Sequence, residues 1–358
     1  MTVRDLYPGY FALVMATGIC SIALRDVGRT SASVVLLVVA IGCLIALCLA
    51  LGWRIARYPR LVLADLTAPD RAFAFFTIVA AFDVLAARLA RDAHRGVAIA
   101  LAVVGAAVWL ALTYTIPVRL ILGPRPQPVL AGVNGTWFVW VVGTQSVAVS
   151  AAVLDQPAHG HARLTALLAV LMWSVGVVLY LMVATLVLTR LLLLEVRPAD
   201  LTPPYWVTMG ATAITVLAAA QILTMPNSPA ANATRPVVGG LAVVLWAFGS
   251  WLIPLLVIFG VWRHGAKRVR LAYLPALWSI VFPLGMYAVA SMHLGKAVQM
   301  PIVERIGRAW TIVAVLAWLI VFVSMCRALL ASPLRLRGSL GTPTTKRVRP
   351  DSSAAKRT

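Results

Sequence analysis

Residues 34–51 read VVLLVVAIGCLIALCLAL and contain no side chain more polar than cysteine. Residues 72–87, in the next apolar segment, read AFAFFTIVAAFDVLAA and add aromatic rings, a threonine and an aspartate. An apolar helix of roughly 17 to 25 residues crosses a bilayer. The two stretches therefore predict two kinds of membrane helix: a plain one that faces lipid, and one that packs against protein or borders a polar path.

The rest of the chain has the same character. Of its 358 residues 61% are hydrophobic and only 12% are charged, whereas an ordinary soluble domain is about a quarter charged. We expect an all-α integral membrane protein with one transmembrane domain over residues 1–331. The ten predicted spans are residues 8–24, 34–53, 72–87, 97–114, 135–154, 164–194, 204–223, 237–262, 274–294 and 309–330.

The spans alternate in composition. Odd-numbered spans carry aromatic, glycine, hydroxyl and amide residues, whereas the even-numbered ones are mostly hydrocarbon, and odd spans recur at a nearly regular interval. This repeat predicts five helical hairpins around a central pore, with odd helices inside and even helices outside. The candidate pore-lining residues are Phe11, Thr17, Gly18, Phe76, Thr77, Gly143, Thr144, Gln145, Gly210, Thr212 and Gly285.

Another interpretation of the same residues stays open. Within a membrane, a hydroxyl group can bond a nearby carbonyl and a glycine lets two helices approach closely. Any one of these residues can therefore serve helix packing, and it is the set that favours a pathway.

The net charge of +20 indicates topology. With ten spans both termini lie on one side, and that side receives the larger share of the 31 Lys and Arg residues. The positive-inside rule then predicts that both termini lie in the cytoplasm, and we expect the protein in the inner membrane. Residues 332–358 are rich in Ser, Thr, Pro and basic residues, so we expect a disordered cytoplasmic tail there. The partners that we expect are the lipid bilayer and small anions, and no nucleic acid.

The sequence contains none of the catalytic motifs that we would expect of an intramembrane enzyme. There is no HExxH zinc site, no GxSxG serine site and no second intramembrane aspartate beside Asp83. His159 and His161 form a short HxH without a supporting ligand cluster, and the cysteines lack metal-ligand spacing. We expect no enzyme activity, no metal site and no cofactor.

The order and spacing of short motifs resemble the tellurite-resistance/dicarboxylate transporter family, which includes the plant slow-type anion channels. The resemblance covers nearly the whole chain and implies ten helices in five hairpins, a pore in each subunit lined by the odd helices, and homotrimers. The motifs are Pro8-Gly9-Tyr10-Phe11, Ala16-Thr17-Gly18, Phe75-Phe76-Thr77, Asn134-Gly135-Thr136-Trp137, Gly143-Thr144-Gln145-Ser146, Pro203-Pro204-Tyr205-Trp206, Met209-Gly210, and Trp278 with Phe282-Pro283-Leu284-Gly285-Met286-Tyr287.

The resemblance also implies an aromatic gate on the ninth helix, for which Phe282 is the best match. A phenyl ring in a narrow apolar constriction excludes water and raises the cost of moving an ion through it. Pro283 removes one backbone hydrogen bond and can kink the helix beside the ring. An ordinary core phenylalanine beside a structural proline is the alternative.

Asp83 lies well inside the third span, where a charge is costly. It either pairs with Arg88 or Arg91, is protonated and couples transport to protons, or tunes the anion path. The function that we expect is transport of small anions, chloride- or nitrate-like or mono- and dicarboxylates such as malate, through the gated pore. The alternative is a proton-coupled C4-dicarboxylate or tellurite-related secondary transporter that uses Asp83.

Overall fold

The computed structural model describes residues 3–92, 94–123, 128–155, 162–225 and 229–338. Within these ranges the protein is helical and has no strand, and ten helices are long and apolar enough to cross a membrane. The predicted all-α fold with ten spans is therefore confirmed. His159, His161 and residues 339–358 of the tail lie outside the described residues.

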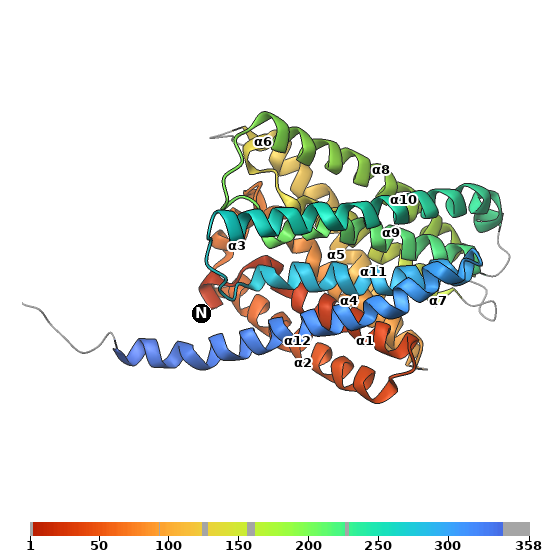
Figure 1. The fold of residues 1–358 in the computed structure, drawn as a ribbon, viewed down its shortest axis with the longest axis horizontal. Helices are drawn as coiled ribbons and strands as arrows, with labels where there is room; N and C mark the ends of the chain where they lie inside the picture. Colours follow the sequence, from red (N-terminus) through yellow and green to blue (C-terminus); the bar gives the residue numbers. More distant parts are fainter. Residues whose placement is uncertain (1–2, 93, 124–127, 156–161, 226–228, 339–358) are drawn as a thin grey trace, which may run out of the picture.

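Two sets of five helices alternate along the chain (Figure 1). We call them inner and outer helices, according to their contacts given below. The inner helices are α1 (Ala12–Asp26), α4 (Phe76–Ala90), α7 (Phe138–Leu154), α9 (Val207–Thr224) and α11 (Trp278–Ala297). The outer helices are α2 (Thr30–Arg57), α5 (Arg95–Leu122), α8 (Ala162–Leu193), α10 (Pro229–Val261) and α12 (Pro301–Gly338).

The inner helices form a closed ring. Along it, α1 contacts α4, α4 contacts α7, α7 contacts α9, α9 contacts α11, and α11 returns to α1. Each inner helix also packs against the outer helix that follows it in sequence. In the inner spans 78–94% of the most apolar stretch is buried, against 17–39% in the outer spans. The predicted separation of buried odd helices from exposed even helices agrees with these values, while a continuous pore inside the ring stays a prediction.

A 3₁₀ turn precedes every inner helix. Three of these turns have proline at their first or second position, where the missing N–H has no helical partner to lose. In a fourth, the Asn134 side chain accepts a hydrogen bond of 2.8 Å from the Thr136 amide. The repeated proline and aromatic motifs thus mark helix entrances: η2 (Pro8–Phe11), η3 (Ala72–Phe75), η4 (Gly135–Trp137), η5 (Pro203–Trp206) and η7 (Pro275–Leu277).

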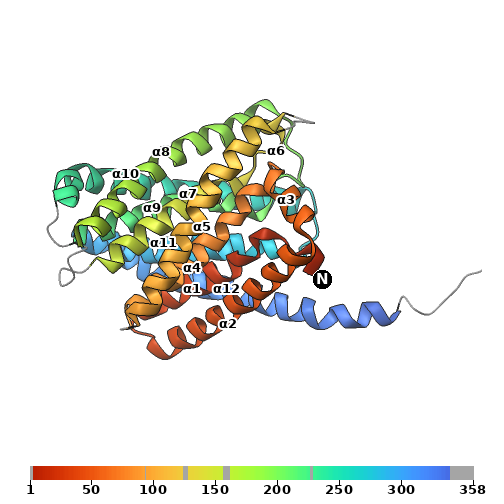
Figure 2. The same cartoon turned by 180° about the vertical axis from the view of Figure 1, so that it is seen from behind.

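The N-terminal end of the described chain and the C-terminal end of α12 lie on the same side of the bundle, as both views show (Figures 1 and 2). We call this the terminal side. The chain crosses from α1 to α2 on the opposite side, where Gly28 has a φ of +82° that favours glycine. Inner helices therefore all run from the terminal side to the opposite side.

Several short elements complete the described fold, and the sequence did not predict them. The α3 helix is held to the bundle by Asp65, whose carboxylate lies 2.7 Å from both Arg54 and Arg71. The α12 helix also runs past residue 332, where we placed the start of the tail. The short elements are η1 (Val3–Asp5), α3 (Pro59–Thr67), α6 (Val129–Gly132) and the π-helical turn η6 (Trp262–Ala266).

Candidate functional site

A small cavity lies inside the ring of inner helices. All five inner helices contribute to its wall, with Ile19 from α1, Val84 from α4, Val149 from α7, Ile214 from α9 and Met286 from α11. Most of the lining is apolar. A cavity on the axis of a helix ring is the place where a path through the bundle would run.

The cavity is narrow, with a volume of about 20 Å³. A single water molecule needs roughly 10 to 15 Å³ of such space, so this volume suits a water molecule and not a hydrated anion. The glycines of the inner helices explain the tight packing. A Cβ atom added to any of four of them would come within 2.7–2.9 Å of a side chain on the neighbouring inner helix. These contacts pair Gly18 with Val84, Gly143 with Phe76, Gly210 with Pro283, and Gly285 with Ile19.

Phe282 lies on the cavity side of α11, just outside the cavity. It precedes Met286 by four positions and Val289 by seven, which places the three side chains on one face of a helix. Met286 and Val289 line the cavity, and Phe282 is buried one turn nearer the terminal side. Next to it, Pro283 packs against Gly210 of α9. The predicted gate pair therefore sits where the cavity ends toward the terminal side.

Two of the predicted pore-lining hydroxyls face outer helices. Thr17 accepts a hydrogen bond of 2.9 Å from the Trp318 indole of α12, and Thr144 accepts one of 2.9 Å from the Trp109 indole of α5. For these residues the contacts favour helix packing, the alternative that the sequence left open. That they border an anion path stays a prediction.

The side chains of Gln145 and Thr212, two further candidates for the pore lining, also face outer helices. Gln145 donates a hydrogen bond of 3.2 Å to the Trp173 carbonyl of α8. A Cβ atom added to Gly249 of α10 would lie 2.5 Å from the Thr212 hydroxyl oxygen. Both side chains are thus turned toward outer helices.

The remaining candidates lie near the helix entrances on the terminal side. Thr77 donates a hydrogen bond of 2.7 Å to the Ala74 carbonyl within the entrance turn of α4. Phe11 is buried at the end of its own turn, and the Phe76 ring lies 6.3 Å from that of Phe73. Their role in a path stays a prediction.

Asp83 is the one predicted site residue that lines the cavity. It is 2% exposed, and among the described residues its carboxyl oxygens have no hydrogen-bond partner. One carboxyl oxygen would lie 2.9 Å from a Cβ atom added to Gly105 of α5, so the group is wedged between α4 and α5. Of the three interpretations of Asp83, the pairing with Arg88 or Arg91 is wrong, because its carboxyl oxygens bond neither guanidinium group; Arg88 pairs with Asp92 and Arg91 with Asp26. The other two interpretations of Asp83 remain.

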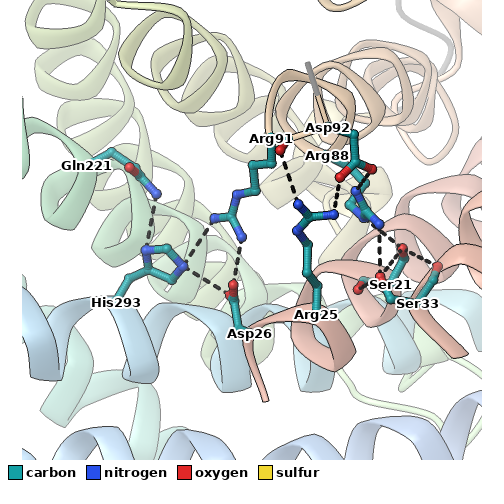
Figure 3. Close-up of polar contacts among 9 residues, drawn as sticks. All are labelled: Ser21, Arg25, Asp26, Ser33, Arg88, Arg91, Asp92, Gln221 and His293. Atoms are coloured by element: carbon teal, nitrogen blue, oxygen red, sulfur yellow. Dashed lines mark hydrogen bonds and ion pairs between the residues drawn. The ribbon is translucent and has the colours of Figure 1, made fainter. Parts of the chain in front are cut away.

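A polar cluster borders the cavity near the C-terminal ends of the inner helices, and Figure 3 draws its contacts. Arg91 and Gln221 line the cavity itself. The Arg91 guanidinium lies 2.7 Å from Asp26 Oδ1, and His293 Nε2 lies 3.0 Å from Asp26 Oδ2. Gln221 Nε2 lies 3.2 Å from His293 Nδ1. These four residues, which we call the mouth cluster, join α1, α9 and α11 to the C-terminal end of α4.

His293 Nε2 faces two groups with opposite needs. It lies 3.2 Å from Arg91 Nη2, which can only donate, and 3.0 Å from the Asp26 carboxylate, which accepts. The nitrogen can serve only one of them at a time, since it either carries a proton or offers a lone pair. The amide nitrogen of Gln221 can only donate, so His293 Nδ1 accepts from it and Nε2 is the ring nitrogen that donates to Asp26.

A second ionic group lies beside the mouth cluster, away from the cavity. Asp92 pairs with both Arg25 and Arg88, and Arg88 also donates to the Ser21 and Ser33 hydroxyls at 3.1 and 3.0 Å. Burial raises the pKa of Asp92. The hydrogen bond and charge of Arg88, together with the charge of Arg25, lower it by more than burial raises it, so the pKa lies below its usual range. This group ties together α1, α2 and α4.

We did not predict the mouth cluster from the sequence, although a signal was available. Because the inner helices run in parallel, their C-terminal ends lie on one side, and Asp26, Arg91 and His293 each stand near such an end. Gln221 gives no comparable signal, because an amide near a helix end is common.

Comparison with known proteins covers nearly the whole chain. The profile of the SLAC1 family, described as voltage-dependent anion channel, matches residues 5–326. An uncharacterised membrane protein of Mycobacterium tuberculosis is 55% identical over 154 residues, which are 43% of this chain and 78% of that protein. An uncharacterised transporter of Methanocaldococcus jannaschii is 25% identical over 318 residues, 85% of this chain and 88% of its own. A sulfite efflux pump of Arthroderma benhamiae is 24% identical over 350 residues, 90% of each chain.

Proposed function

This chain belongs to the SLAC1 family of voltage-dependent anion channels, and we propose that it conducts small anions across a membrane along the axis of its inner helix ring. The observation that carries the proposal is the cavity to which all five inner helices contribute. With about 20 Å³ of space the cavity is too small for an anion, so conduction requires the ring to widen.

Phe282 is our candidate for the gate. Phe282 lies one helical turn from the cavity toward the terminal side, on the same face of α11 as Met286. This position supports the role, because the phenyl ring would have to turn aside before an ion entered the cavity from the terminal side. Pro283 leaves one carbonyl of α11 without its helical partner and gives the backbone room to bend there. The cavity lining next to the Phe282 side chain is mostly hydrocarbon, which suits closure by exclusion of water.

We propose small inorganic or carboxylate anions as substrates: chloride, nitrate, and mono- or dicarboxylates such as malate. Sulfite belongs in the same test, since one relative is a sulfite efflux pump. We further propose an inner-membrane location, with both termini in the cytoplasm as the positive-inside rule indicates, and a homotrimer with an individual path in each subunit.

The test is flux in a defined membrane. Purified protein in liposomes should release each anion down an imposed potential faster than protein-free liposomes. No flux of any of these anions from well-folded protein would contradict the proposal.

Asp83 supports a second candidate function, a proton-coupled C4-dicarboxylate or tellurite-related transporter. Asp83 belongs to the cavity wall, and its carboxyl group, packed against Gly105 of α5, has no hydrogen-bond partner among the described residues. Because an unpaired carboxylate is costly in a low-dielectric interior, gain and loss of a proton there would change the energy of the whole path. Anion flux measured with and without an imposed proton gradient would separate the two candidates, because only the proton-coupled transporter requires the gradient.

A further inference from the structure

The mouth cluster has the composition of an anion-binding site. Arg91 is the only charged residue besides Asp83 in the described lining of the cavity, and it stands at the end opposite the termini. Its side chain is 22% exposed, as is that of His293, so solvent reaches both, and Arg91 also lines the cavity. An anion that passes between the cavity and the outside meets this guanidinium.

A carboxylate already occupies this position. Asp26 places one oxygen 2.7 Å from Arg91 and the other 3.0 Å from His293, so the two groups hold the two ends of one planar, negatively charged group. Asp26 is only 12% exposed and lies at the end of α1. An external anion would need the same contacts and therefore competes with Asp26.

We infer that Arg91, His293 and Gln221 form a binding site for a small oxyanion at the mouth of the cavity, and that the Asp26 carboxylate fills this site in the closed structure. The inference rests on the proposed conduction of anions, and it adds the class of anion and the residues that meet it. Arginine presents its N–H groups in a planar fork that matches two oxygens of one ligand.

The geometry favours oxyanions over halides. A carboxylate, nitrate or sulfite has oxygens that can contact Arg91 and His293 at once, as Asp26 does. A chloride ion can also touch both groups, but it presents a single centre and does not match the planar guanidinium fork as two oxygens of one group do. The site therefore prefers formate or nitrate to chloride at equal concentration.

The chain supplies a matched control for Asp26. Asp92 also pairs with arginines and lies beside the mouth cluster in Figure 3, but neither it nor its partners Arg25 and Arg88 line the cavity. Asp26→Asn frees the proposed site, whereas Asp92→Asn removes a carboxylate of the same kind from the neighbouring group.

The test measures binding without transport. Formate, as the smallest carboxylate probe, is titrated against purified protein, and the rise of the melting temperature gives the dissociation constant by linkage. We expect Asp26→Asn to lower that constant about tenfold, which corresponds to about 1.4 kcal/mol, and Asp92→Asn to leave it within about twofold. Chloride at the same ionic strength should raise the melting temperature less than formate does.

Arg91 variants complete the test. Arg91→Gln should abolish the formate-dependent shift, while Arg91→Lys keeps the charge, loses the fork and should keep part of the shift. Equal formate constants in the wild type, Asp26→Asn and Arg91→Gln proteins would overturn the inference. Flux in liposomes is measured separately, so an absence of flux with intact formate binding would count against conduction and not against this site.

Discussion

The indole nitrogen of Trp318 donates a hydrogen bond of 2.9 Å to the Thr17 hydroxyl and so connects the last transmembrane helix to the first. The same kind of link recurs around the bundle, where each outer helix bonds the inner helix of the next pair. The other links join Trp109 to Thr144, Trp173 to the Thr215 carbonyl, Trp246 to Ser291, and Ser33 to Arg88. These links make polar groups of the inner helices part of the contact between the two rings.

Trp318→Phe should therefore destabilise the protein without opening the path. Loss of one buried hydrogen bond costs about 1 kcal/mol, so we expect a lower melting temperature in detergent and unchanged anion flux per folded protein. Trp310→Phe on the same helix is the control, because its buried indole nitrogen has no hydrogen-bond partner in the described structure. Equal melting temperatures for the two variants would show that the Trp318 link contributes nothing.

Phe282→Ala should raise anion flux in liposomes, because it removes the ring that we propose as the gate on the terminal side of the cavity. The control is Phe138→Ala, which deletes an equally buried ring that instead packs 5.5 Å from Tyr180 of α8. If Phe282→Ala folds and conducts no faster than the wild type, Phe282 is not the gate.

Asp83→Asn separates a passive channel from a proton-coupled carrier. The change keeps the shape of the side chain and removes its ability to carry a proton. For the conduction that we propose, anion flux should be the same with and without a proton gradient, and the same in both proteins. Flux that requires the gradient and disappears in Asp83→Asn would instead establish the proton-coupled alternative.

Gly210→Ala should force α9 and α11 apart beside the proposed gate. The new Cβ atom would lie 2.8 Å from Pro283 Cγ, and overpacking of this kind costs about 1 to 3 kcal/mol. We expect a lower melting temperature and altered flux. Gly240→Ala on α10 is the control, since nothing lies within 4 Å of its added Cβ atom; a glycine-to-alanine change there should be neutral or stabilising. The packing argument fails if both variants melt alike.

Acid should destabilise the protein through Asp92. Its pKa is lowered in the folded state, because Arg88 and Arg25 outweigh the effect of burial. The ionised form therefore stabilises the fold at pH values above the unfolded pKa of about 4, and this stability is lost as the pH falls through the lower folded pKa. Melting temperatures measured between neutral and strongly acidic pH should fall less in Asp92→Asn than in the wild type.

Glu304→Gln is the control for that measurement. Glu304 pairs with Arg308 at 2.7 Å, but the arginine side chain is 48% exposed, and exposed pairs contribute little. This variant should keep the acid-dependent loss of the wild type. An equal flattening of the pH curve in both variants would remove Asp92 from the explanation.

Much of the fold could be read from the sequence, because in lipid each helix must satisfy its own backbone and shows this as a long apolar run. The plain residues 34–51 and the polar residues 72–87 correctly separated an exposed outer helix from a buried inner one. The repeated proline and aromatic motifs marked the entrances of the inner helices. Short elements such as α3 escaped prediction because contacts with Arg54 and Arg71 fix them, not an apolar pattern.

The sequence by itself thus determined the number of spans and their alternation, since these follow from composition along single helices, and the order of its short motifs carried the family resemblance. Only the tertiary structure decided where each polar side chain points, because a buried helix has polar groups on several faces and its neighbours select among them. It turned Thr17, Thr144 and Gln145 toward outer helices and left the Asp83 carboxyl group without a hydrogen-bond partner in the part of the chain that the structure describes. It also brought Asp26, Arg91 and His293 together at the mouth, since parallel inner helices place residues far apart in sequence at one end of the ring.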